Sequence, residues 1–237
     1  MTTPSPGSPS IAKPDYWWYR ARTELLRTAL SQYVGEPRRV LDVGSADGPS
    51  VRWLRSRAQH VSLDLDPRGL GAGGVCGSAL ALPFAAGSFD VVAAFDVVEH
   101  CEPEELALAE LHRVLAPGGR LLVSVPAYNW AWTRFDDHNG HYRRYTRSRA
   151  VRAVESSGLV VERATYAFTA MFPLFAADRL RRKLAERTQR VAGGLELAAT
   201  CRRSRRSRPS PSGCCCCWPA PTNTCWRRET CLSVLRC

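Results

Sequence analysis

A glycine-containing turn and an acidic residue further along the chain have the types and spacing of a ribose-binding site. The turn lies in the segment Val40-Leu41-Asp42-Val43-Gly44-Ser45-Ala46-Asp47-Gly48, and the acidic residue is Asp64, which stands 22 positions after Asp42. Glycine lets a ligand approach the backbone where a Cβ atom would clash. A carboxylate can accept hydrogen bonds from both hydroxyls of a ribose. Together the two features predict a nucleoside-containing cofactor.

Two cofactor classes use such a site, and the glycine spacing bears on the choice. The dinucleotide pattern Gly-x-Gly-x-x-Gly falls on Gly44, Ala46 and Pro49, where proline is a poor match for the third glycine. The other pattern, an acidic residue followed by Gly-x-Gly-x-Gly, falls on Asp42, Gly44, Ala46 and Gly48. There Asp42 would bind an amine, and a ligand with both an amine and a ribose is S-adenosylmethionine. A tight turn that binds no ligand is the alternative to both.

The elements that would position these residues alternate along most of the chain. Apolar runs typical of strands cover residues 39–43, 61–64, 75–77, 89–95, 120–125 and 159–168. Segments typical of helices cover residues 15–33, 50–57, 103–115, 148–157 and 172–190. This alternation predicts an α/β fold, a doubly wound Rossmann-like sheet of mostly parallel strands with helices on both faces. Ligands of such sheets bind at the carboxyl ends of the strands, where Gly44 and Asp64 fall.

Composition and charge exclude several classes of protein. No apolar run approaches the ~20 residues that a membrane span needs, and the N-terminus lacks the pattern of a signal peptide. The net charge is +11, but residues 201–237 hold eight basic and one acidic side chain and therefore carry +7 of it. The body has no basic stripe with interleaved aromatics. We therefore expect a cytoplasmic protein that binds no nucleic acid and does not span a membrane.

The two ends of the chain differ in composition from its body, residues 15–195. Residues 1–14 are rich in proline, serine, threonine and glycine, and we expect them to be disordered. Residues 196–237 are basic and contain four adjacent cysteines, Cys214 to Cys217, a spacing that suits no metal site. We interpret this tail as a disordered segment translated out of frame. The sheet is therefore expected to lack a well-formed final antiparallel strand.

Further segments follow one another in the order of a known family. They are residues 61–67, Gly77-Ser78-Ala79-Leu80-Ala81-Leu82-Pro83-Phe84, Gly87-Ser88-Phe89-Asp90-Val91-Val92, Asp96-Val97-Val98-Glu99-His100 and residues 111–120. Together with residues 40–48 they resemble the class I S-adenosylmethionine-dependent methyltransferases, close to the type 11 group, over roughly residues 16–175. The resemblance implies a Rossmann-like fold, S-adenosylmethionine as the cofactor and methyl transfer as the reaction.

The resemblance also assigns the cofactor contacts residue by residue. It implies that Asp42 and the backbone around Gly44 hold the methionine moiety and that Asp64 holds the ribose hydroxyls. The adenine would pack on one apolar side chain and lie beside a short loop, in which Ser78 stands where the family usually has aspartate. Phe95, the last residue of the fourth strand, and Asp96, which follows it, would border the sulfonium. The full set is Asp42, Gly44, Ala46, Gly48, Asp64, Leu65, Ser78, Ala79, Phe95 and Asp96.

The segment Asp96-Val97-Val98-Glu99-His100 faces the expected substrate side. Its Asp-x-x-Glu-His spacing is similar to the metal-binding Glu-x-x-Glu-His of some O-methyltransferases in quinone and small-RNA pathways, and oxygen with imidazole is reasonable metal ligation. The alternative, which we favour, is that Glu99 and His100 are hydrogen-bonded beneath the cofactor. We therefore expect no bound metal and take His100 as a candidate catalytic residue.

Residues 128–145 form the least generic part of the chain. They hold several aromatic side chains, His138, His141 and the pair Arg143-Arg144. Such a set could receive an anionic or glycan-like acceptor, and either histidine could take the proton of an attacking hydroxyl. We take His141 as the second candidate catalytic residue. The alternative is a surface loop held in place by its aromatic side chains.

These observations predict methyl transfer to a small-molecule, lipid or glycan acceptor, with an oxygen as the favoured nucleophile. The alternative from another class is a non-catalytic or regulatory protein that keeps the fold and binds S-adenosylmethionine without turnover.

Overall fold

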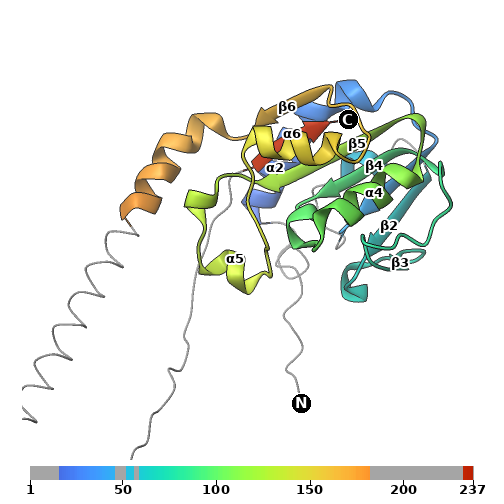
Figure 1. Cartoon of the computed structure of the whole chain (residues 1–237), viewed down its shortest axis with the longest axis horizontal. Helices are drawn as coiled ribbons and strands as arrows, with labels where there is room; N and C mark the ends of the chain where they lie inside the picture. The colour runs from blue at the N-terminus through green and yellow to red at the C-terminus, as the bar shows by residue number, and fades with distance from the viewer. Residues whose placement is uncertain (1–15, 46–51, 56–58, 182–231, 237) are drawn as a thin grey trace, which may run out of the picture. The chain divides into compact units, whose positions relative to one another are not determined.

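Seven strands form one sheet in the order β3-β2-β1-β4-β5-β7-β6 (Figure 1). The computed structural model describes residues 16–45, 52–55, 59–181 and 232–236. The strands are β1 Arg39–Val43, β2 Gln59–Asp64, β3 Val75–Cys76, β4 Phe89–Phe95, β5 Leu115–Pro126, β6 Arg163–Tyr166 and β7 Leu232–Arg236. Neighbours among β1 to β5 pair in parallel, and β7 is antiparallel to β5 and β6. The predicted α/β class with a mostly parallel sheet is therefore confirmed.

Helices and short 3-10 turns connect the strands. Among the described residues of this sheet unit, the helices are α2 Trp17–Val34, α3 Arg52–Arg55, α4 Glu104–Val114, α5 Arg134–His138 and α6 Arg147–Glu155. The 3-10 turns are η2 Pro67–Gly69, η3 Val98–His100 and η4 Asn129–Ala131. Both η3 and the segment that contains η4 and α5 follow the carboxyl ends of central strands, which is where such folds bind ligands.

Two hydrophobic clusters, one on each face of the sheet, hold the helices in place. Along β4, Val92 and Ala94 belong to the cluster that includes buried residues of α4 and α6, which Figure 1 shows together on one side of the sheet. Val91 and Ala93 belong to the other cluster, with buried residues of α2 and α3. Successive side chains of a strand point to opposite faces. Cover on both faces explains why residues 91–95 of β4 are all apolar.

The strand β7 corrects our expectation that the sheet would lack a final antiparallel strand. Leu232–Arg236 pairs with residues 122–126 of β5 and with residues 163–166 of β6. Parallel crossovers leave the facing edges of β5 and β6 with unpaired backbone groups, and a strand between them satisfies both rows. The rest of the tail, residues 196–231 and 237, lies outside the described residues, as do residues 1–14, so the expectation of disorder there stays a prediction.

Some strand boundaries also differ from the prediction. Strand β5 begins at Leu115 rather than at residue 120, because the segment around Gly119 forms a bulge: Phe89 pairs with Leu115, whereas Val91 pairs with Arg120. A Cβ atom on Gly119 would lie 2.8 Å from the carbonyl oxygen of Ala116. Proline and glycine therefore mark an irregularity inside the pairing rather than its start.

Residues Thr169–Arg227 form a second compact unit, of which the structure describes residues 169–181. It contains η5 Thr169–Met171 and a helix over residues 172–181, so the predicted helix over 172–190 is confirmed as far as 181. Arg179 is buried, and its guanidinium lies 5.0 Å from the centroid of the Phe175 ring. None of the helices in the described ranges is both long and apolar enough to cross a bilayer.

Candidate functional site

The turn after β1 is built so that only glycine fits at position 44. Gly44 has φ of 68°, and its N–H donates to the carbonyl oxygen of Leu63 over 2.8 Å. A Cβ atom at this position would lie 2.4 Å from Cγ2 of Val97. The turn is therefore fixed between the end of β2 and the segment after β4, with its backbone available to a ligand. Two other predicted contacts, Ala46 and Gly48, lie outside the described residues.

The two predicted acidic contacts lie in different environments. Asp42 is buried in β1, with its Oδ2 3.6 Å from Nε2 of His60 on β2. Asp64 ends β2 and is half-buried, and its Oδ1 accepts a hydrogen bond from the N–H of Asp66 over 2.8 Å. The next side chain, Leu65, is 72% exposed, which is unusual for leucine and leaves an open apolar surface. Asp64 and Leu65 therefore lie at the carboxyl end of β2, the edge of the sheet at which such folds bind ligands.

The loop after β3 brings Ser78 and Ala79 towards the same edge of the sheet. The Ser78 hydroxyl oxygen accepts from the N–H of Leu80 over 3.1 Å, and residues 78 and 81 form an isolated antiparallel bridge. Ala79 is buried. The serine side chain thus stabilises its own turn, as Ser, Asn and Asp side chains often do.

A hydrogen-bonded group of three side chains surrounds the end of β4. Arg22 of α2 donates to Oδ2 of Asp96 over 2.8 Å and to the hydroxyl of Ser124 over 2.9 Å. The Ser124 hydroxyl donates to the other carboxylate oxygen of Asp96 over 3.0 Å. Asp96 has φ of 57°, a conformation that non-glycine residues adopt rarely and mostly at functional sites. Phe95, the preceding predicted contact, is buried, with the Arg22 guanidinium 5.9 Å from its ring centroid.

Sequence reasoning missed Arg22 and Ser124. A signal for Arg22 was present, because it precedes Leu26 and Leu30 at intervals of four residues, and all three are buried on one face of α2. A charged side chain on an otherwise apolar helix face points to a buried partner. Ser124 offers no comparable signal, since nothing in its apolar strand identifies which polar group it meets.

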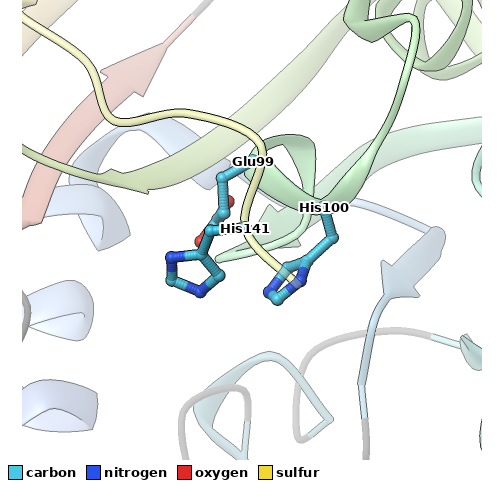
Figure 2. Close-up of side chains that lie close together, drawn as sticks. All are labelled: Glu99, His100 and His141. Carbon is cyan, nitrogen blue, oxygen red and sulfur yellow. The ribbon is translucent and has the colours of Figure 1, made fainter. Parts of the chain in front are cut away.

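On the substrate side, Glu99, His100 and His141 converge although 41 positions separate the two histidines (Figure 2). Each contributes one ligand-type atom, and these atoms lie within 4.8 Å of one another. The two imidazole rings are 4.6 Å apart between centroids and nearly perpendicular, at 88°. The N–H of Tyr142 donates to the carbonyl oxygen of Glu99 over 2.8 Å and so joins the loop to η3. The structure thus brings both predicted catalytic histidines together.

Burial shifts the pKa values of Glu99 and His100 in this cluster. Glu99 is fully buried, and desolvation together with the Asp96 carboxylate raises the pKa of Glu99 well above its ordinary value. Within the described ranges neither carboxylate oxygen of Glu99 has a hydrogen-bond partner. Desolvation and the neighbouring His141 lower the pKa of His100 to about 4, although the residue keeps an exposed surface. His100 is therefore neutral near pH 7.

A buried ion pair orients His141. Its Nδ1 lies 2.9 Å from Oδ1 of Asp136, and Arg144 donates to both oxygens of that carboxylate over 2.8 and 2.9 Å. Burial alone would raise the pKa of Asp136, but hydrogen bonds from His141 and Arg144 outweigh it and lower the pKa to about 2. An ionised carboxylate only accepts, so Nδ1 of His141 carries the proton. In the neutral form of the ring, Nε2 is then the nitrogen that carries the lone pair.

The neighbouring arginines are paired with carboxylates of the protein. Arg143 contacts Glu102 and lies 3.2 Å from Glu104, and Arg149 lies 2.9 Å from Glu104. Arg144 forms an ion pair with Asp136, so the Arg143-Arg144 pair does not present two free cations to an anionic acceptor. The same segment lines a cavity of about 620 Å³ with Glu102, Glu104, Glu105, Asn129, Trp132, Tyr142, Arg143 and Arg149.

Comparison with known proteins gives one family match and several relatives. A family model described as a methyltransferase domain matches residues 41–123. A demethylmenaquinone methyltransferase of Thermus thermophilus is 38% identical over 102 residues, 37% of this chain and 46% of that protein. One from Beutenbergia cavernae is 34% identical over 156 residues, 60% of each chain. The biotin biosynthesis bifunctional protein BioHC of Cellvibrio japonicus is 31% identical over 137 residues, 51% of this chain and 27% of that protein.

This chain spans less than two thirds of the length of each of these curated relatives. Solved structures show the fold at lower identity. The [4+2]-cyclase SpnF is 20% identical with a TM-score of 0.57, over 94% of this chain and 83% of that one. A SAM-dependent methyltransferase of Thermotoga maritima is 18% identical with a TM-score of 0.54, over 68% of this chain and 83% of that one.

Proposed function

This chain carries a class I methyltransferase domain, and we propose that it transfers the methyl group of S-adenosylmethionine to a small-molecule acceptor. The observation that carries the proposal is the match of residues 41–123 to the methyltransferase domain, combined with the arrangement at the carboxyl ends of β1, β2 and β4. There the Gly44 turn, Asp64 and Asp96 end three adjacent strands. A cofactor with a ribose and an amine suits these groups.

Each predicted contact would then hold a distinct part of the cofactor. The backbone at Gly44 would approach the methionine moiety, and Asp64 would accept from the ribose hydroxyls. The exposed Leu65 side chain would cover one face of the adenine, which buries its open apolar surface. Asp42 stays the proposed partner of the amine of the methionine moiety. Because its side chain is buried in β1, it would interact with the amine from inside the sheet. Asp96 and Phe95 would border the sulfonium.

The reaction that follows is an in-line displacement. A lone pair of the acceptor oxygen attacks the methyl carbon while the carbon–sulfur bond breaks, and the sulfur keeps that electron pair as S-adenosylhomocysteine leaves. In the metal-free protein, Nε2 of His141 would take the hydroxyl proton, and Asp136 would stabilise the resulting imidazolium over its 2.9 Å contact with Nδ1. Positioning of the two reactants supplies most of the remaining acceleration.

An oxygen on a small molecule, lipid or glycan is the proposed acceptor. Two relatives are named demethylmenaquinone methyltransferases, which favours a quinone-type ring as the acceptor molecule. The methyl group of menaquinone is bonded to a ring carbon, so these names support the ring and not the choice of oxygen. The cavity of about 620 Å³ beside the His141 loop is lined by Trp132 and Tyr142 together with charged side chains, which suits a ring that carries hydroxyl groups. We place the reaction in the cytoplasm, because Cys76 and Cys101 are free thiols, in keeping with a reducing compartment.

A second candidate function is cofactor binding without methyl transfer. The observation that favours it is the [4+2]-cyclase among the proteins with this fold, because a cyclase name denotes a different reaction. Cofactor affinity is expected under both functions and does not distinguish them. Release of S-adenosylhomocysteine in the presence of an acceptor distinguishes them, because only methyl transfer produces it.

Titration calorimetry tests the cofactor half of the proposal. We expect S-adenosylhomocysteine to bind one site per chain and NAD to give no heat, because Pro49 occupies the third glycine position of the dinucleotide pattern. Leu65→Ser is the matched probe of adenine packing, since Leu65 is exposed in the free protein and the change should weaken binding while stability stays the same. Binding of NAD with no heat from S-adenosylhomocysteine would overturn the proposal.

A further inference from the structure

The cluster of Glu99, His100 and His141 has the composition of a metal site. Two imidazoles and one carboxylate form a three-ligand set that suits divalent first-row transition metals and leaves positions open for water or a substrate oxygen. We propose that these three residues bind a divalent cation of the Mn²⁺ or Fe²⁺ type. This proposal replaces our expectation from the sequence that no metal is bound. That expectation considered Glu99 and His100 but not His141.

A cation can bind once side-chain rotations bring the three ligand atoms closer together. The three ligand-type atoms lie within 4.8 Å of one another. Ligands at about 2.1 Å from a common cation lie about 3.0–3.4 Å apart at octahedral or tetrahedral angles, so a pair of atoms 4.8 Å apart has to approach by roughly 1.4–1.8 Å. Figure 2 shows Glu99 and His100 projecting from one turn towards the His141 ring. Rotations about side-chain bonds of this loop and turn provide such a contraction.

Glu99 supplies an independent observation that points to a cation. Its side chain is fully buried, and in the described part of the chain both carboxylate oxygens have no hydrogen-bond partner. Two cationic side chains act electrostatically on Glu99, and each is paired with another carboxylate, Arg22 with Asp96 and Arg144 with Asp136. Buried polar groups in native proteins are nearly always paired, and an orphaned carboxylate needs an explanation such as an ion.

The surroundings of His141 match those of metal-bound histidines. Such a histidine typically donates its other ring N–H to a carboxylate, which fixes the ring and raises the basicity of the ligating nitrogen. His141 does so through Nδ1 to Asp136, and Arg144 holds that carboxylate by two hydrogen bonds. Nε2 is therefore the ligating atom. His100 keeps an exposed surface, so the site is reachable from solvent.

A bound cation changes the proton chemistry proposed above. Nε2 of His141 cannot hold both a metal and a proton, so in the loaded protein the acceptor hydroxyl would be deprotonated by coordination and its proton released to water. Cation binding itself does not depend on methyl transfer. It is therefore testable without cofactor or acceptor, and its failure leaves the proposed function standing.

Electron paramagnetic resonance of free Mn²⁺ measures the binding directly. Mn²⁺ is the probe because it disfavours thiolates, and the chain holds ten cysteines. The full chain is titrated in reducing buffer, and we expect one bound Mn²⁺. Glu99→Gln and His141→Ala should each weaken binding by about 10-fold or more, and Asp136→Asn by about 10–100-fold. His112→Gln is the control, because His112 bonds the carbonyl of Ser157 outside the cluster.

Folding of the variants is checked by thermal unfolding with and without Mn²⁺. Glu99→Gln keeps the shape of the side chain, so the metal-free variant should unfold as the wild type does or later, while Mn²⁺ should raise Tm only in the wild type and His112→Gln. No stoichiometric Mn²⁺ on the wild type would overturn the inference. So would equal affinities for the wild type, Glu99→Gln and His141→Ala, or binding that disappears only when thiols are alkylated.

Discussion

Replacing Gly44 by alanine places a methyl group where the structure has no room for it. The new Cβ atom would lie 2.4 Å from Cγ2 of Val97, and the backbone has φ of 68°. A left-handed backbone costs a non-glycine residue about 1–2 kcal/mol, and overpacking adds about 1–3 kcal/mol. We therefore expect Gly44→Ala to lower the free energy of unfolding by roughly 2–5 kcal/mol, measured by urea denaturation.

Two control variants separate the backbone cost from the steric cost. Gly118 has φ of 77°, and a Cβ atom there would meet nothing within 4 Å beyond its own chain neighbours, so Gly118→Ala should cost only about 1–2 kcal/mol. Val97→Ala removes the clashing methyl groups and leaves Val97 Cβ at 3.7 Å from the new atom. In the double variant the two changes should therefore couple favourably by about 1–3 kcal/mol. Equal costs for Gly44→Ala and Gly118→Ala, or additive costs in the double variant, would refute the steric explanation.

Three further outcomes follow from the same geometry. Asp64→Ala should weaken binding of S-adenosylhomocysteine by about 1.5–3 kcal/mol in calorimetry, the range of hydrogen bonds to a charged group, and a change within error would remove Asp64 from the ribose role. His141→Ala should lower turnover while the cofactor affinity stays nearly the same, since the loop is expected to contact only the acceptor; loss of cofactor binding would instead make the loop a structural support. Arg144→Met should cost about 3–5 kcal/mol in urea denaturation, because it leaves the buried Asp136 carboxylate without its bidentate partner, whereas Arg27→Met, in an exposed pair on α2, should leave stability unchanged.

Local sequence signals were sufficient for most of the sheet. Strands β1 and β4 have the predicted bounds, residues 39–43 and 89–95, because a short, mostly apolar run between polar turns has few other interpretations. The strand β7 was not predictable in the same way. Its five residues follow a long polar and cysteine-rich stretch, and their pairing depends on the edges of β5 and β6, which lie far away in the sequence.

The candidate site shows the same division. Gly44 and Asp64 could be identified from spacing, since they lie at the ends of predicted strands and parallel strands bring their carboxyl ends together. The contact of Glu99 with His141 could not be predicted, because the segment that carries His141, residues 128–145, has no periodicity that fixes its path. What fixes it in the structure is the hydrogen bond from Tyr142 to Glu99 and the buried pair of Asp136 and Arg144. The hydrogen bond and the ion pair both join parts of the chain in the folded structure, so the sequence of a single segment does not reveal them.

Release of S-adenosylhomocysteine in the presence of acceptor is the measurement that tests the proposed methyl transfer most directly. The protein is incubated with methyl-labelled S-adenosylmethionine and fractions of a cell extract, with isoprenoid quinols as one defined acceptor, and both the labelled product and S-adenosylhomocysteine are quantified. We expect equal amounts of the two with the wild type, and a reduced rate with His141→Ala at unchanged cofactor affinity. Tight binding of S-adenosylhomocysteine with no label transferred to any fraction would contradict it and favour the binding protein without turnover.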